Sequence, residues 1–85
     1  MAKANPVLKH AILEVVNKQL KDLDPPETKE TYDRLVADGI SDQEARRLIG
    51  CVVSSEIFDV LKQQQPFDHA RFVKALNKLP KLPWE

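Results

Sequence analysis

The sequence has little of several things that would define a class of function. Its 85 residues include one cysteine, two glycines and five aromatic residues. A lone cysteine excludes an internal disulfide, and with no long apolar amino-terminal segment it predicts a cytoplasmic protein. Two glycines are too few for a glycine-rich phosphate-binding loop. No apolar run approaches the roughly 20 residues that cross a bilayer, so the sequence predicts no membrane partner.

A surplus of charge is lacking too, because 13 basic and 13 acidic residues cancel. Binding to nucleic acid needs basic side chains concentrated on one surface, and the sequence therefore predicts no nucleic-acid partner. The length predicts a single domain, residues 1–85. A domain of this size has a thin core, which favours association with a partner subunit.

What the sequence does have is a set of clear helix-boundary signals. Each of four segments joins a capping side chain to a proline or glycine: Asn5-Pro6, Asp24-Pro25-Pro26-Glu27, Gly39-Ile40-Ser41-Asp42-Gln43-Glu44 and Pro66-Phe67-Asp68. They predict an all-α fold, a compact four-helix bundle-like domain. The expected helices span about 6–23, 26–38, 42–64 and 69–79, followed by an extended proline-containing tail at 80–85.

The boundaries also predict individual contacts. We expect N-caps at Asn5, Asp24, Ser41 and Asp68, capping boxes ending at Glu27 and Glu44, a left-handed Gly39, and a hydrophobic staple between Phe67 and Phe72.

Apolar residues at helical spacing predict which faces are buried. In the first helix the expected core stripe is Leu8, Ile12, Val15, Val16, Leu20 and Leu23. The second helix turns Thr28, Tyr32, Leu35 and Val36 inward, and the fourth turns Phe72, Leu76 and Leu79 inward. The third helix has the widest apolar arc, which includes Ile49, Val53, Ile57, Val60 and Leu61, so we place it at the centre of the bundle.

Glu56 interrupts that arc, one turn after Val52 and one turn before Val60. An ionised carboxylate is costly to remove from water. We therefore expect Glu56 to be buried and to be protonated, paired with a cation, hydrogen-bonded, bound to metal, or at an interface. A structural glutamate satisfied by Tyr32, a histidine or helix N–H groups is one interpretation, and a ligand site or a subunit contact are the others.

Two histidines are candidate partners for a site. His69, in the first turn of the fourth helix, could face Glu56 and share a cleft suited to proton transfer or to part of a metal site. The interpretation that the sequence favours is a partly exposed residue at the start of the helix. His10 and Glu14, one turn apart, predict a solvated pair. Mid-helix Cys51 predicts a small packing residue, and no residue set predicts a catalytic site.

Two further pairs are candidates for interaction with a partner. Arg46 and Arg47 predict a solvated face that could meet an acidic partner. Leu82 and Trp84 in the tail are expected to dock on the bundle, because a large ring gains by leaving water. The alternative is that the tail is a short peptide ligand for another protein.

The sequence resembles a family of short bacterial helical proteins of unknown function. The resemblance rests on the four helix-boundary segments and on His10, Tyr32, Arg34-Leu35, Glu44-Ala45, Glu56-Ile57 and Arg71-Phe72. The resemblance covers residues 5–80 and implies an all-α fold without an activity. Members of that family carry histidines around the position of Glu44, in a pattern typical of metal binding. Here Gln43 and Arg47 stand in those places. The resemblance therefore implies site residues only at His10, Glu44 and Glu56.

The sequence therefore predicts a non-catalytic cytoplasmic protein, without a cofactor, that associates with itself or with another protein. The alternative is a small metal- or ligand-binding protein that uses Glu56 with His10, Glu44 or His69.

Overall fold

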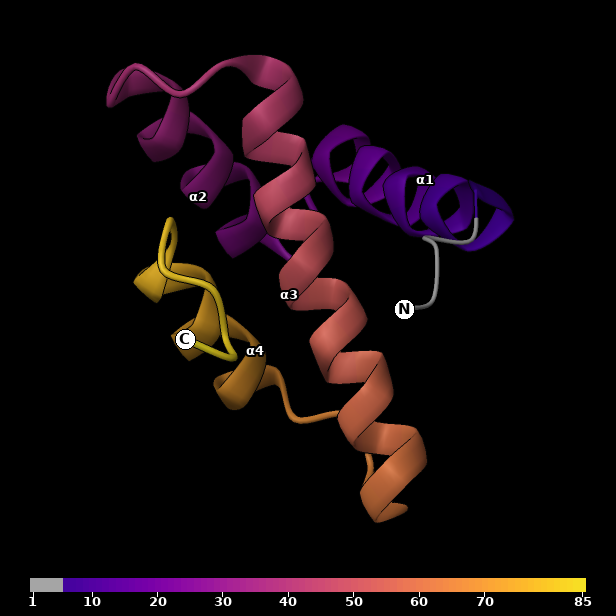
Figure 1. Cartoon of the computed structure of the whole chain (residues 1–85). Helices are drawn as coiled ribbons and strands as arrows, with labels where there is room; N and C mark the ends of the chain where they lie inside the picture. The colour runs from indigo at the N-terminus through magenta and orange to yellow at the C-terminus, as the bar shows by residue number, and fades with distance from the viewer. Residues whose placement is uncertain (1–5) are drawn as a thin grey trace.

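The computed structural model describes residues 6–85, which form four α-helices and a tail (Figure 1). The helices are α1 (Pro6–Asp22), α2 (Pro26–Ala37), α3 (Asp42–Gln63) and α4 (His69–Lys78). The predicted all-α bundle-like fold is confirmed. The expected cap at Asn5 lies outside the described residues. None of the helices within 6–85 combines the length and the apolar composition that a membrane crossing requires.

The turn between α2 and α3 forms as its sequence predicts. Gly39 has a φ of 91°, the left-handed conformation that an L side chain rarely adopts. The N–H of Ile40 donates to the carbonyl of Leu35 and that of Gly39 to Val36, each over 3.0 Å, which is a Schellman motif. Ser41 then caps α3 by accepting from the Glu44 N–H over 3.1 Å.

The start of α4 also follows its sequence. Asp68 accepts from the Arg71 N–H over 3.1 Å, and the Phe67 and Phe72 rings lie 5.7 Å apart between centroids. This is the predicted cap with its hydrophobic staple.

The start of α2 corrects the prediction, because its N-cap is Pro25 and no side chain caps it. A cap at Asp24 would bond the N–H of the second or third residue after it, and the second, Pro26, has no N–H. The Glu27 Oε1 atom is buried without a hydrogen-bond partner, so the expected capping box is absent.

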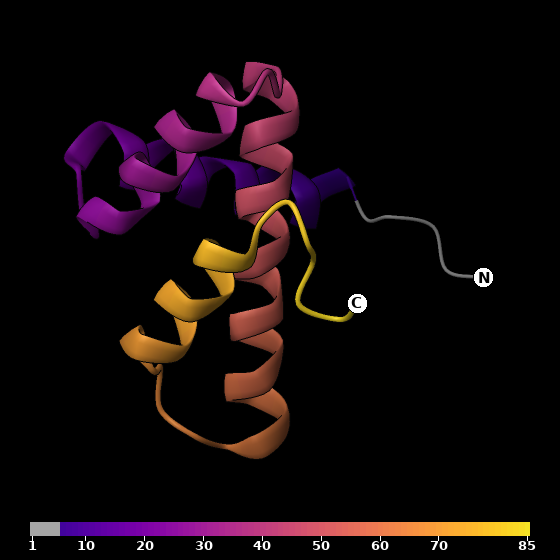
Figure 2. The same cartoon turned by 90° about the vertical axis from the view of Figure 1, so that its left-hand side faces the viewer.

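Helix α3 lies at the centre, as predicted, and contacts the three other helices. α1 crosses its N-terminal half on one side, while α2 and α4 pack on the other (Figures 1 and 2). The radius of gyration is 12.5 Å, close to the ~12 Å expected for this length. The crossing of α1 and α3 is close at Gly50, where an added Cβ would lie 3.3 Å from Ile12 Cγ2.

The core is drawn from all four helices and the residue after α4. Its buried hydrophobic members are Val16, Leu35, Ala45, Leu48, Ile49, Val52, Val53, Phe72, Leu76 and Leu79. The prediction for α4 is therefore confirmed. Arg34 links α2 to α4, because its guanidinium donates to the carbonyls of Leu79 (2.9 Å) and Leu76 (3.1 Å) at the end of α4.

Part of the predicted core is exposed instead. Leu8 and Val15 on α1 and Leu23 just after it face water, as does Val36 on α2. On α3, Ile57 and Leu61 are exposed too, and they belong to the C-terminal half of that helix, which runs on past α1 (Figure 1). The apolar stripes are real, but the neighbouring helices are too short to cover their full length.

Candidate functional site

Glu56 is buried, as its place in the apolar arc predicts. The residue is 6% exposed, although it is a carboxylate in a core of aliphatic side chains. Burial on this scale requires polar partners, because an unpaired charge there would destabilise the fold.

The main partner of Glu56 is Arg71 of α4. The Arg71 Nη2 atom donates to Oε1 over 2.7 Å and Nε donates to Oε2 over 3.0 Å, a two-point pairing. The Asp68 N–H donates to Oε1 over 3.2 Å. Arg71 above all, and then this N–H, lower the pKa of Glu56 against the opposing effect of burial. Glu56 is thus an ionised carboxylate that joins α3 to α4, and not the partner of Tyr32 or a histidine.

Arg71 was not predicted as the partner, although the sequence contains a signal for it. Arg71 is the third residue of α4, where the positive end of the helix dipole disfavours a cation. A cation at that position needs an anion nearby, and Glu56 is the carboxylate that the apolar arc leaves without a partner.

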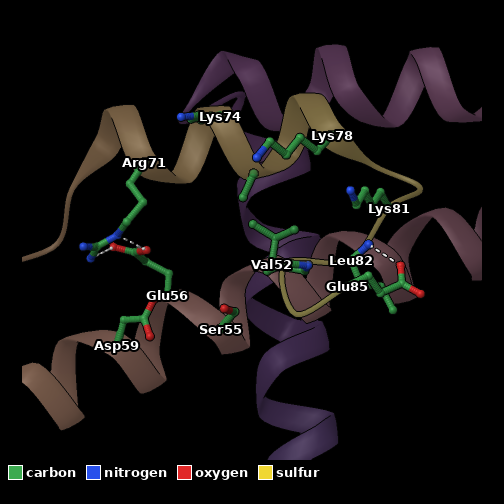
Figure 3. A pocket seen from close by; sticks show the side chains of 12 residues that line it. Val52, Ser55, Glu56, Asp59, Arg71, Lys74, Lys78, Lys81, Leu82 and Glu85 are labelled. Atoms are coloured by element: carbon green, nitrogen blue, oxygen red, sulfur yellow. Dashed lines mark hydrogen bonds and ion pairs between the residues drawn. The ribbon is translucent and has the colours of Figure 1, made fainter.

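Glu56 and Arg71 form one end of a hollow of about 310 Å³ that we call the α3–α4 pocket (Figure 3). It is lined by Val52, Ser55, Glu56 and Asp59 from α3, by Arg71, Lys74, Ala75 and Lys78 from α4, and by Lys81, Leu82, Pro83 and Glu85 from the tail. Four lining side chains are cationic and three are anionic.

His69 does not face Glu56, so the alternative in which the two share a cleft is wrong. Its Nε2 atom lies 3.6 Å from Glu27 Oε2, on the side of α4 that packs against α2. The reason is rotation along the helix, since residues two apart point to nearly opposite sides and Arg71 takes the side facing α3. His69 is a partly exposed residue near the start of its helix, the interpretation that the sequence favours.

The remaining candidates for a metal site also lie apart. His10 pairs with Glu14 over 2.9 Å on the exposed face of α1, as predicted. Glu44 pairs with Arg47 over 2.8 and 2.7 Å. Within residues 6–85, no group of three or more His, Cys, Asp or Glu side chains could hold a metal ion.

The two adjacent arginines differ from each other. Arg47 is bound to Glu44 on the surface and lies 3.9 Å from the Cys51 sulfur. Arg46 donates to Asp42 over 2.9 Å and to Asn17 of α1, and it covers the Tyr32 ring of α2. Arg46 therefore joins three helices, so the predicted solvated face describes Arg47 better than Arg46.

The tail docks through one of the two predicted residues. Leu82 is half-buried and packs on the core, but Trp84 is 63% exposed. The tail turns at its end, where the Glu85 N–H donates to the Leu82 carbonyl and the Glu85 carboxylate accepts from the Leu82 N–H. This turn holds Trp84 away from the bundle, so the expectation that it is docked was wrong.

Cys51 is half-buried, and burial raises the pKa of its thiol. A protonated thiol is a weak nucleophile, which agrees with the packing role that the sequence predicts.

A second hollow opens on the other side of Glu56. We call it the apolar groove, and its volume is about 340 Å³. Its lining is almost wholly hydrocarbon and comes from α1, α3, α4 and the segment that leads into α4: Val15, Gln19, Val53, Glu56, Ile57, Val60, Leu61, Phe67 and Phe72. Phe67 is 56% exposed and Leu61 73% exposed at its edge. Six of the lining residues were predicted as core, so an open surface was not expected here: Val15, Val53, Ile57, Val60, Leu61 and Phe72.

Comparison with known proteins adds no relative, because no family model, curated protein or solved structure matches this chain.

Proposed function

We propose that the protein is a non-catalytic helical module that associates with a second copy of itself through the apolar groove. The main support is the C-terminal end of α3, which runs on past α1 (Figure 1). Three large hydrophobic side chains there are open to water: Ile57 is 43%, Phe58 60% and Leu61 73% exposed. Contiguous exposed apolar surface on a small domain is typical of an interaction site.

A second copy is the proposed occupant because the surface has both parts of a self-complementary contact. The groove is a hollow, and Leu61, which belongs to its lining, offers an apolar side chain that is 73% exposed. A two-fold axis near this side chain would place each Leu61 in the groove of the partner, which is the reciprocal arrangement of a symmetric dimer.

Charge and size agree with this occupant. The formal net charge is zero, so two copies do not repel each other at long range. A standard interface covers about 800 Å² on each partner, roughly one-eighth of the 6033 Å² surface of this chain. The cytoplasmic location predicted from the lone Cys51 is part of the same proposal.

The test compares two substitutions of exposed hydrophobic residues. Sedimentation velocity and native mass spectrometry should show a concentration-dependent dimer with a Kd on the order of 10 µM. Leu61→Glu places a charge in the contact and should give a monomer with unchanged helical circular dichroism. Val36→Glu, at a 42% exposed site on α2, is the matched control and should leave the dimer intact.

Two results would count against self-association. One is a wild-type protein that stays monomeric to about 1 mM, which would leave the groove to a different protein. The other is an equal loss of dimer in the Leu61 and Val36 variants, which would place the contact elsewhere.

A further inference from the structure

The α3–α4 pocket has a surplus of unpaired cations. Within residues 6–85, most arginines and lysines have an ion pair, a carbonyl or a ring as partner. Five lysines have none: Lys9, Lys21, Lys74, Lys78 and Lys81. Three of these five line the α3–α4 pocket. Three ammonium groups without a partner within 6–85 therefore surround one hollow.

The usual structural role of such lysines is already filled. Cations near the end of a helix often stabilise its last carbonyl groups. Here the guanidinium of Arg34 donates to the carbonyls of Leu76 and Leu79 from the α2 side. Lys78 and Lys81 are therefore not needed as caps of α4.

None of the three anionic side chains that line the pocket has an ion pair with these lysines, although Glu85 lies at the same end of the pocket as Lys81 (Figure 3). Glu56 is bound by Arg71, and the Glu85 carboxylate accepts from the Leu82 N–H over 2.7 Å. Asp59 lies at the Arg71 end, where its charge acts on Arg71 and raises the pKa of that side chain together with Glu56. In Figure 3 Glu56 and Asp59 stand at one end of the pocket, and Lys78 and Lys81 lie toward the other.

Between the two ends the surface is apolar. Val52 and Ala75 form the middle of the pocket, and Leu82 borders it from the tail. Ser55 of α3 adds a hydroxyl with no partner among the described residues. The hollow has the size of a small-molecule site, about 310 Å³, with a hydrocarbon centre and ammonium groups at one side.

We infer that the α3–α4 pocket binds a small organic anion, with its carboxylate or phosphate group between Lys78 and Lys81 and its apolar body on Val52, Ala75 and Leu82. The pairing of an oxyanion with two ammonium groups is charge-assisted on both sides. The apolar body adds the burial that a simple ion lacks. This inference does not depend on the dimer, because the apolar groove lies on the other side of Glu56.

The test uses three probes followed by NMR of backbone amides. Benzoate combines the anion with an apolar body, inorganic phosphate has the charge alone, and benzyl alcohol has the body alone. Benzoate should bind with saturation at a Kd of about 1 mM, shifting residues 52–59 and 74–85. Phosphate should bind at the same residues about tenfold more weakly, and benzyl alcohol should not saturate.

The matched variants compare lysines that are equally free of partners. The double variant Lys78→Gln/Lys81→Gln should weaken benzoate binding at least tenfold, while Lys9→Gln/Lys21→Gln should leave it unchanged. All four lysines are exposed, so neither change should disturb folding, and helical circular dichroism checks this.

Three results would overturn the inference. Shifts that rise linearly without saturation would show only a general effect of salt. Equal weakening by both double variants would show attraction to net charge and not to this pocket. Benzyl alcohol binding as tightly as benzoate would show an apolar hollow without selectivity for anions.

Discussion

Two arginine–carboxylate pairs in this molecule have the same two-point chemistry and opposite surroundings. The Glu44–Arg47 pair joins residues three apart on the surface of α3, and the carboxylate side chain is 46% exposed. The Glu56–Arg71 pair joins α3 to α4 across 15 residues, and its carboxylate side chain is 7% exposed. The bonds are of similar length, so geometry alone does not rank them. What differs is the cost of leaving one charge without its partner.

The largest effect should come from removing the cation of the buried pair. Arg71→Met leaves Glu56 ionised in the core and should lower the free energy of unfolding by about 3 kcal/mol. Glu56→Gln should cost only about 1 kcal/mol, because the Arg71 side chain is 34% exposed and can turn to water. Urea unfolding at pH 7, followed by circular dichroism, measures both. A Glu56→Gln variant less stable than Arg71→Met would contradict this asymmetry.

The same pair should make stability sensitive to acid. The pKa of Glu56 lies below its ordinary value of 4.5 in the folded protein. As the pH falls, the unfolded chain therefore binds a proton at Glu56 before the folded protein does. The contribution of Glu56 to stability is present above pH 4.5 and is lost as the pH falls through the folded pKa.

In Arg71→Met the effect of acid on the stability contribution of Glu56 has the opposite sign, because a buried carboxylate without a cation has a raised pKa and protonation stabilises the folded state. The stability difference between wild type and Arg71→Met should therefore narrow as pH falls from 7 to about 3. Urea midpoints along this range measure it, with Arg47→Met as the control whose difference stays small. A gap that stays constant would mean that the carboxylate is not the group responsible.

The smallest effect should come from the surface pair. Arg47→Met or Glu44→Gln should leave the free energy of unfolding almost unchanged, since water solvates either charge when it is left alone. Thermal unfolding at low and at high salt checks this, because the small contribution should vanish as salt screens it. A loss as large as that of Arg71→Met would show that burial is not what separates the two pairs.

Local signals predicted the helices well because the contacts that end a helix are close in sequence. Gly39, Ser41 and Asp68 act within a few residues of themselves, and all three behave as their residue types predict. Asp24 is the exception, because α2 takes Pro25 as its N-cap and Pro26 has no N–H for an aspartate cap to bond.

The partners of charged residues were harder to predict, because they depend on which helix lies opposite. Glu56 was identified as buried, but Arg71 and not His69 faces it, and this depends on the rotation of α4. The apolar groove was missed for a related reason. The pattern on α3 shows that Ile57 and Leu61 are hydrophobic, but it does not show how far α1 extends beside them.

The sequence by itself determined the all-α fold and the requirement that Glu56 find a polar partner. These follow from capping, periodicity and the cost of burying a charge, which act within one helix. The tertiary structure alone decided that Arg71 is that partner, that Trp84 stays in water, and that the end of α3 is uncovered. These depend on the lengths and crossing positions of several helices, which a pattern along one chain segment does not contain.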